Sequence, residues 1–146
     1  MSRFDSSTVA ATAFAGGLLV IALTGCSEVD DLLSQRHRET FPTYAEAERS
    51  WVGVDIPGWI PRDSVDLNNL ATNDETVSVI RVTTLSEPVG CEPGERTGIP
   101  ALAAEWSTEK WPAQVLTCGD YEVMPLDDGW LGWFNATEPG QKPSAH

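Results

Sequence analysis

Few side chains in this 146-residue chain have the types and spacing that catalysis requires. A serine or cysteine nucleophile needs a base beside it, and histidine is the usual base. The chain has only two histidines, His37 and His146, in segments near opposite ends of the sequence that we expect to be mobile. The sequence therefore argues against a Ser–His or Cys–His catalytic pair.

Carboxylates are the remaining candidates for acid–base chemistry. Asp127 is adjacent to Asp128, and Asp120 is separated from Glu122 by one residue. A glycosidase sets two carboxyl groups about 5–10 Å apart across a cleft, whereas adjacent acids in a turn face water and alternate acids on a strand share one face. We therefore expect solvated side chains and assign no catalytic residue. A small carboxylate-dependent hydrolase acting on the cell wall is the alternative function.

Motifs for metals and cofactors are also weak. The only adjacent glycines lie in the N-terminal apolar run, and no Gly-Lys-Ser/Thr motif for phosphate binding occurs. Calcium takes about 6–8 oxygen ligands, and the clusters Asn73-Asp74-Glu75 and Asp127-Asp128 each supply too few. The sequence thus predicts neither a metal site nor a cofactor.

The six tryptophans are the most informative feature of the composition. Aromatic faces contact ligands and concentrate at binding hot spots, but a small domain also uses tryptophan to fill its core. We expect core packing for Trp51, Trp59, Trp106 and Trp111. Trp130 and Trp133 point to opposite faces of a regular strand. One of them could therefore pack inward while the other is exposed, and these two form the candidate ligand platform.

The N-terminal segment has the features of a signal peptide. An uncharged run, VAATAFAGGLLVIAL, extends from Val9 to Leu23. Its length fits the roughly 7–15 apolar residues of a signal-peptide core and is short for a spanning helix, which needs about 20. The run ends in Leu23, Thr24, Gly25 and Cys26, which is an aliphatic residue, two small residues and a cysteine.

This motif resembles the lipobox of bacterial lipoproteins at all four positions. The resemblance implies that the Cys26 thiol receives a diacylglycerol and that residues 1–25 are removed. Two acyl chains hold a protein stably on a membrane. The implied location is the extracytoplasmic face of the cell membrane, which the protein contacts through the lipid on Cys26. An ordinary cleaved signal peptide with an incidental cysteine, or an uncleaved short anchor, is the alternative.

The charge of the chain argues against one class of partner. The formal net charge is −13, and an acidic chain repels phosphate backbones, so we expect no nucleic acid. The same charge disfavours adhesion to anionic lipid. We expect this acidity to keep a tethered domain soluble.

If Cys26 carries lipid, Cys91 and Cys118 remain as a pair. An exported protein meets an oxidising compartment, where such a pair forms a disulfide. A two-cysteine metal site is the alternative, but it needs further His or Cys ligands. Because the two histidines are far away in the sequence, we predict the disulfide.

Local patterns predict several strands and few helices. Thr43 with Glu46 fits a capping box, and the spacing of apolar residues favours a short amphipathic helix over 44–51. Strands are expected over 65–71, 75–85, 114–124 and 130–134, and one or two helical turns over 101–106. The β-branched residues of 75–85 fall on both faces, which predicts a central strand. The prolines and glycines of 86–100 indicate a loop.

Eight residues give the mature chain a second resemblance. They are Trp59, Pro61, Cys91, Trp106, Cys118, Gly129, Trp130 and Trp133. Their layout is similar to that of small lipoproteins of high-GC Gram-positive bacteria. Such proteins have no assigned activity, so the resemblance implies no functional residue.

The combined prediction is a membrane-anchored protein with one small domain. We expect an α+β fold over residues 43–135, with a small antiparallel sheet, one or two short helices and one disulfide. Residues 26–42 are expected to form the lipidated cysteine and a tether, and residues 136–146 a disordered tail. The expected function is a non-enzymatic binding or accessory module of the cell envelope, which contacts an envelope protein or a wall polymer.

Overall fold

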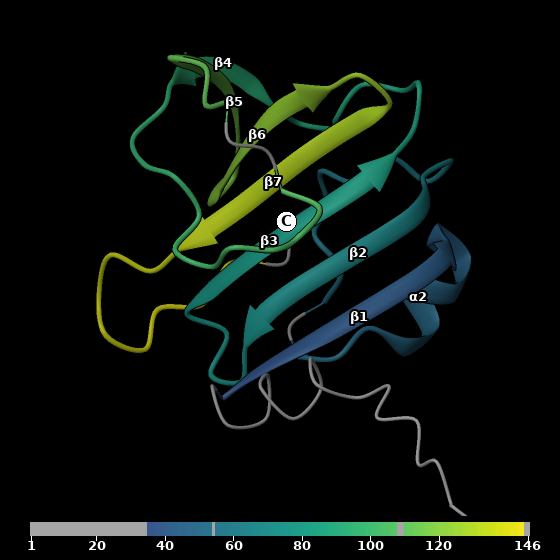
Figure 1. Cartoon of the computed structure of the whole chain (residues 1–146), viewed down its shortest axis with the longest axis horizontal. Coiled ribbons are helices and arrows are strands. Elements are labelled where there is room, and N and C mark those ends of the chain that lie inside the picture. The colour runs from purple at the N-terminus through teal and green to yellow at the C-terminus, as the bar shows by residue number, and fades with distance from the viewer. Residues whose placement is uncertain (1–34, 54, 108–109, 145–146) are drawn as a thin grey trace, which may run out of the picture.

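One antiparallel sheet of seven strands organises the protein (Figure 1). The computed structural model describes residues 35–53, 55–107 and 110–144, so the expected signal peptide and Cys26 lie outside the described residues. The elements are β1 (Arg36–Thr43), α2 (Tyr44–Ser50), β2 (Val65–Thr72), β3 (Val77–Thr83), β4 (Glu92–Glu95), β5 (Gln114–Cys118), β6 (Tyr121–Leu126) and β7 (Gly129–Asn135).

The strand order is β1-β2-β3-β7-β6-β5-β4, and each strand is antiparallel to its neighbours. The sheet therefore consists of two meanders that meet where β3 pairs with β7, from Val77 opposite Asn135 to Thr83 opposite Gly129. Strand β3 is paired on both sides, which confirms the prediction of a central strand. In Figure 1, α2 lies beside β1 at one edge of the sheet, and β4 forms the other edge.

The prediction of an α+β fold is wrong, because the protein is mostly β. In the described part of the chain, α2 is the single helix. Residues 101–106, where helical turns were expected, form an irregular segment. The backbone N–H of Ala101 donates to Asn135 Oδ1 at 3.0 Å, so this segment binds to the end of β7 instead of coiling on itself.

The short helix itself agrees with its prediction. It covers 44–50, and the side chain of Thr43 at its N-cap accepts a hydrogen bond from the Glu46 N–H at 3.3 Å. The bond satisfies one of the unpaired amides at the start of the helix. Tyr44 and Ala47 are the buried residues of α2, so the helix packs one side onto the sheet.

Three further boundaries differ from the prediction. Residues 36–42, expected in the tether, lie in edge strand β1, and residues 92–95, expected in a loop, form edge strand β4. The expected strand 114–124 is a hairpin of β5 and β6, and Gly119 turns the chain at φ +63°. Edge strands need less apolar surface than central ones, and a left-handed backbone at Gly119 suits the residue without a Cβ.

The C-terminal segment up to residue 144 contacts the domain, contrary to the prediction of a disordered tail. The Ala136 N–H donates to the Thr76 carbonyl at 2.7 Å. Ser144 donates both its backbone N–H and its hydroxyl to Asp120 Oδ2, at 2.8 and 2.6 Å. Pro143, which directly precedes Ser144, is buried.

Both faces of the sheet carry a hydrophobic core, and the tryptophans are divided between them. The first face, covered by α2 and by residues 51–53 and 55–64, holds Trp51, Trp59 and Trp130. The second face, covered by residues 96–107 and 110–113, holds Trp106, Trp111 and Trp133. All six tryptophans therefore contribute to core packing.

Glycine at position 132 allows one of these tryptophans, Trp59, to approach the sheet closely. Trp59 is 1% exposed. A Cβ built on Gly132 would overlap the Trp59 indole ring. The absence of a side chain at this position in β7 therefore creates the space that the indole fills.

Candidate functional site

A small polar pocket lies on the first face, near the β1 edge of the sheet. It is lined by His37, Trp51, Val52, Asn69, Ala71, Glu75, Ser78, Tyr121 and Pro143, and its cavity volume is about 20 Å³. We call it the His37 pocket. Its lining comes from four strands, the segment after α2, the β2–β3 turn and the C-terminal segment, so only the folded chain assembles it.

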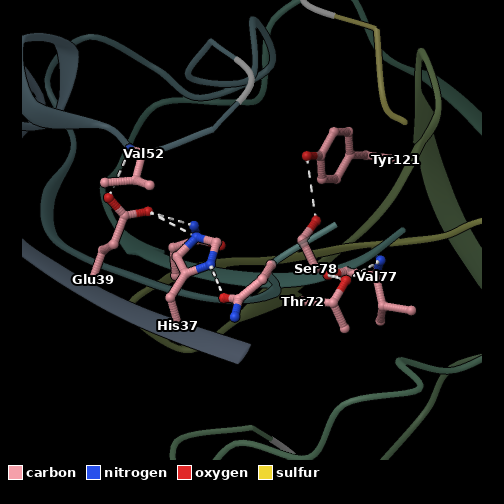
Figure 2. Close-up of polar contacts among 9 residues, drawn as sticks. His37, Glu39, Val52, Thr72, Val77, Ser78 and Tyr121 are labelled. Carbon is pink, nitrogen blue, oxygen red and sulfur yellow. Dashed lines mark hydrogen bonds and ion pairs between the residues drawn. The ribbon is translucent and has the colours of Figure 1, made fainter. Parts of the chain in front are cut away.

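Strand register places the polar side chains of the pocket on one face. His37 is opposite Ala71, and Glu39 is opposite Asn69. Because side chains at alternate positions of a strand share a face, His37 and Glu39 point to the same side as buried Phe41. Figure 2 shows His37 and Glu39 on one side of the group, and Ser78 with Tyr121 on the other.

Glu39 is a buried carboxylate that accepts two hydrogen bonds. Its side chain is 7% exposed. Oε1 accepts from the Val52 N–H and Oε2 from Asn69 Nδ2, both at 2.8 Å (Figure 2). In the described structure, the one cationic side chain within ion-pair distance is His37, whose Nε2 lies 3.8 Å from Glu39 Oε2. A buried carboxylate is costly unless a positive charge accompanies it.

The contacts of the His37 ring define its tautomer. Nδ1 lies 3.3 Å from Asn73 Oδ1. An amide oxygen only accepts hydrogen bonds, so Nδ1 carries the proton and the neutral ring presents Nε2 as an acceptor. Nε2 is buried and has no hydrogen-bond partner among the described residues.

A second unsatisfied acceptor lines the same pocket. Asn69 is 3% exposed, and its Oδ1 makes no hydrogen bond within the described part of the chain. Leaving a buried acceptor unpaired costs about 1–3 kcal/mol. The pocket therefore brings together two acceptors that lack donors.

Ser78 and Tyr121 complete the polar wall. Both residues are buried, and Ser78 Oγ donates to the Tyr121 hydroxyl oxygen at 3.3 Å. Burial raises the pKa of Tyr121 to about 12, so its phenol is protonated at neutral pH. The pair therefore supplies uncharged oxygens to the pocket.

Glu75 reaches the pocket from a strained turn between β2 and β3. Its φ of +62° is in the left-handed region, which usually costs a residue other than glycine about 1–3 kcal/mol. Its side chain is 12% exposed, and Oε2 lies 3.6 Å from Lys142 Nζ. The turn thus positions a second, largely buried carboxylate at the pocket.

A wider hollow lies on the opposite face of the sheet. It has a volume of about 370 Å³ and is lined by Arg81, Trp106, Ser107, Leu126, Asp127 and Asp128. We call it the Trp106 hollow. Arg81 donates from one terminal nitrogen to both carboxylate oxygens of Asp128, at 3.0 and 2.8 Å. The ion pair fixes two of the charged groups in a hollow that the half-buried Trp106 also lines.

The two tryptophans of the expected ligand platform, Trp130 and Trp133, make different contacts in β7. Trp133 is 1% exposed, contacts the edge of Trp111 and donates from Nε1 to Glu122 Oε2 at 3.0 Å. Trp130 is half-buried and donates from Nε1 to the Ser86 carbonyl at 2.9 Å. The two rings are on opposite faces, as expected, but they belong to separate cores.

The candidate carboxylate pairs make structural contacts. Glu122 accepts hydrogen bonds from the Thr97 and Gly98 amides and so binds this part of the chain to β6. Asp120 binds Ser144, and Asp128 binds Arg81. Asp120 and Glu122 line a surface hollow of about 300 Å³, and Asp127 and Asp128 line the hollow described above.

The structure also places the two cysteines and the candidate metal ligands of the described residues. Cys91 and Cys118 form a disulfide, which confirms the predicted pairing. Within the described residues, no group of three or more His, Cys, Asp or Glu is arranged to hold a metal ion. Asp74 Oδ1 accepts from the amide and hydroxyl of Thr76, and hydrogen bonds to threonine hydroxyls lower its pKa.

Sequence reasoning missed the His37 pocket, although the sequence contains a weak signal for it. His37, Glu39 and Phe41 alternate along β1, and Asn69 interrupts the apolar residues of β2. An isolated polar residue within a buried strand suggests a paired polar group nearby. Only the register between the two strands shows which residues meet.

Comparison with protein-family models, with curated proteins and with solved structures finds no match to this chain. Among the helices of the described residues, none is long and apolar enough to cross a bilayer.

Proposed function

We propose that the protein is a lipid-anchored module on the extracytoplasmic face of the membrane and that its β domain binds a ligand without transforming it. The observation that carries this proposal is the division of the three cysteines. Cys91 and Cys118 are disulfide-bonded, as is typical of exported proteins. Cys26 is left over, and it is the cysteine that follows Leu23, Thr24 and Gly25.

Replacing Cys26 with alanine tests the anchor. The wild-type chain is expected in the membrane fraction of the cells that produce it, and Cys26→Ala in the soluble fraction, because the variant lacks the thiol that accepts the lipid. The measurement is fractionation followed by detection of the protein in each fraction. The double variant Cys91→Ala/Cys118→Ala is the control and should remain in the membrane. Retention of Cys26→Ala in the membrane would contradict the anchor.

For the binding surface we propose the Trp106 hollow and, as its ligand, the neutral sugar portion of a wall polymer. Its volume of about 370 Å³ is within the range of about 300–1,000 Å³ of small-ligand sites. Trp106 supplies an apolar face, and Arg81 with Asp127 and Asp128 supplies donors and acceptors that suit hydroxyl groups. The net charge of −13 favours a neutral over an anionic polymer.

Titration with an N-acetylglucosamine tetrasaccharide tests this surface. Saturable binding is expected for the full chain, followed by tryptophan fluorescence or calorimetry. Trp106→Ala should weaken binding by about 10-fold or more, because stacked aromatic side chains act as hot spots. Trp51→Ala, which changes a half-buried tryptophan on the opposite face, should leave affinity unchanged. Equal weakening by both variants would show that the Trp106 hollow is not the site.

A further inference from the structure

We propose that the His37 pocket is a binding site for an ammonium group, either as the free ion or as the end of a primary amine. The pocket is on the face opposite the Trp106 hollow, and the inference does not depend on the proposed function. It rests on the size of the cavity, on two buried acceptors without donors, and on the charge of the surrounding carboxylates.

The size of the cavity limits the guest to one heavy atom. A cavity must offer about 10–15 Å³ to hold a water molecule, and the His37 pocket offers about 20 Å³. An ammonium nitrogen with its hydrogens is about as large as water. A guanidinium or a sugar ring would not fit.

The polar atoms of the pocket require a donor. Asn69 Oδ1 only accepts, and neutral His37 presents Nε2 as an acceptor because Nδ1–H faces Asn73 Oδ1. Ser78 Oγ gives its proton to Tyr121 and keeps lone pairs that can accept. An ammonium group, with at least three N–H bonds, can donate to Asn69, His37 and Ser78 together.

The charge of the site favours a cationic donor over water. The Glu39 side chain is 7% exposed, and its ionic neighbour within the described residues is His37, at 3.8 Å. The two hydrogen-bond donors to Glu39, the Val52 N–H and Asn69 Nδ2, are uncharged. Glu75 adds a second carboxylate, whose Oε2 lies 3.6 Å from Lys142 Nζ. An ammonium group would be favoured here, because opposite charges attract strongly where solvent is excluded.

The pocket is open enough to admit a terminal amine. Val52 is part of its lining and is 58% exposed, so the lining reaches the surface. Buried Pro143 forms another part of the wall and is held by neighbouring contacts of Lys142 and Ser144. An amine could place its nitrogen in the pocket while its carbon chain extends past Val52.

Nitrogen NMR of labelled histidine tests the proposal directly. The chain has two histidines, and His146 serves as an internal reference for His37. The purified full chain is titrated with ammonium chloride, methylammonium chloride and tetramethylammonium chloride at constant ionic strength. A saturable shift of the His37 Nε2 signal is expected with ammonium, and none with tetramethylammonium, which has the same charge but no N–H. The His146 signal should not move in either titration.

The two sources of an ammonium group give different results. If methylammonium shifts His37 at least as strongly as ammonium, the site accepts the end of a primary amine. If only ammonium acts, the site takes the free ion. Either result supports the proposal. No saturable shift with ammonium or methylammonium, or an equal response to tetramethylammonium, would overturn it and leave water as the guest.

Two variants and one matched control locate the binding. Asn69→Leu removes the unpaired acceptor, and Glu75→Gln removes one carboxylate charge. Each should weaken binding by about 10-fold or more, as expected for loss of a charged hydrogen bond or a buried charge partner. Asn68→Leu changes the neighbouring residue on the opposite face of β2 and should leave the affinity unchanged. Unchanged affinity in both pocket variants would contradict the assignment even if the wild type binds.

Discussion

Replacing Trp59 with alanine is expected to lower the free energy of unfolding by about 3–5 kcal/mol, the usual loss for a large aromatic residue in a core. Trp59 is 1% exposed, and its ring lies 6.2 Å from that of Tyr121. The space above Gly132 that it fills would become a cavity. Urea denaturation of the oxidised chain, with the disulfide intact, measures the change.

Two further substitutions separate cavity formation from loss of polar contacts. Trp59 Nε1 is buried and has no hydrogen-bond partner in the described structure, so Trp59→Phe should cost less than Trp59→Ala. Gly132→Ala should also be destabilising, because its Cβ would overlap the indole. If Trp59→Ala unfolds at the wild-type urea concentration, Trp59 does not pack on β7 as described.

Loss of the disulfide should be nearly as costly. Cys91 and Cys118 are 27 positions apart in the sequence, and closing a loop of this size stabilises a protein by roughly 3–4 kcal/mol in the chain-entropy model. We expect the double variant Cys91→Ala/Cys118→Ala to lose about this much stability. Reduction of the wild-type disulfide should have a similar effect. The measurement is urea denaturation with and without reductant.

The control for this experiment is the third cysteine. Cys26→Ala should unfold at the same urea concentration as the wild type, and reductant should destabilise it equally. The double variant should not respond to reductant. If reductant leaves wild-type stability unchanged, the bond contributes nothing to the folded domain.

Local signals predicted the parts of the fold that depend on neighbours in sequence. The Thr43–Glu46 cap predicted the start of a helix, and the β-branched residues of β3 predicted a central strand. Both predictions rest on a few neighbouring residues, and both are confirmed. The disulfide could also be predicted, because one cysteine was accounted for by the N-terminal motif. Each of these inferences needed only residue types and their spacing.

The parts that depend on pairing between distant segments were missed. Strand β1 contains mostly polar residues and reads as a tether, yet it pairs with β2 from Arg36 to Thr43. Residues 101–106 are attached at Ala101 to Asn135 in β7, which is 34 positions away in the sequence. Without the β1–β2 register, the sequence could not show that His37 and Asn69 line one pocket.

The position of β1 also limits how far the sheet can lie from a lipid on Cys26. The strand begins at Arg36, ten positions after Cys26. Because an extended chain spans at most about 3.3–3.6 Å per residue, ten residues cover about 35 Å at full stretch. A lipid on Cys26 would therefore keep the start of the sheet within one domain diameter of the bilayer, so partners would have to come to the membrane surface.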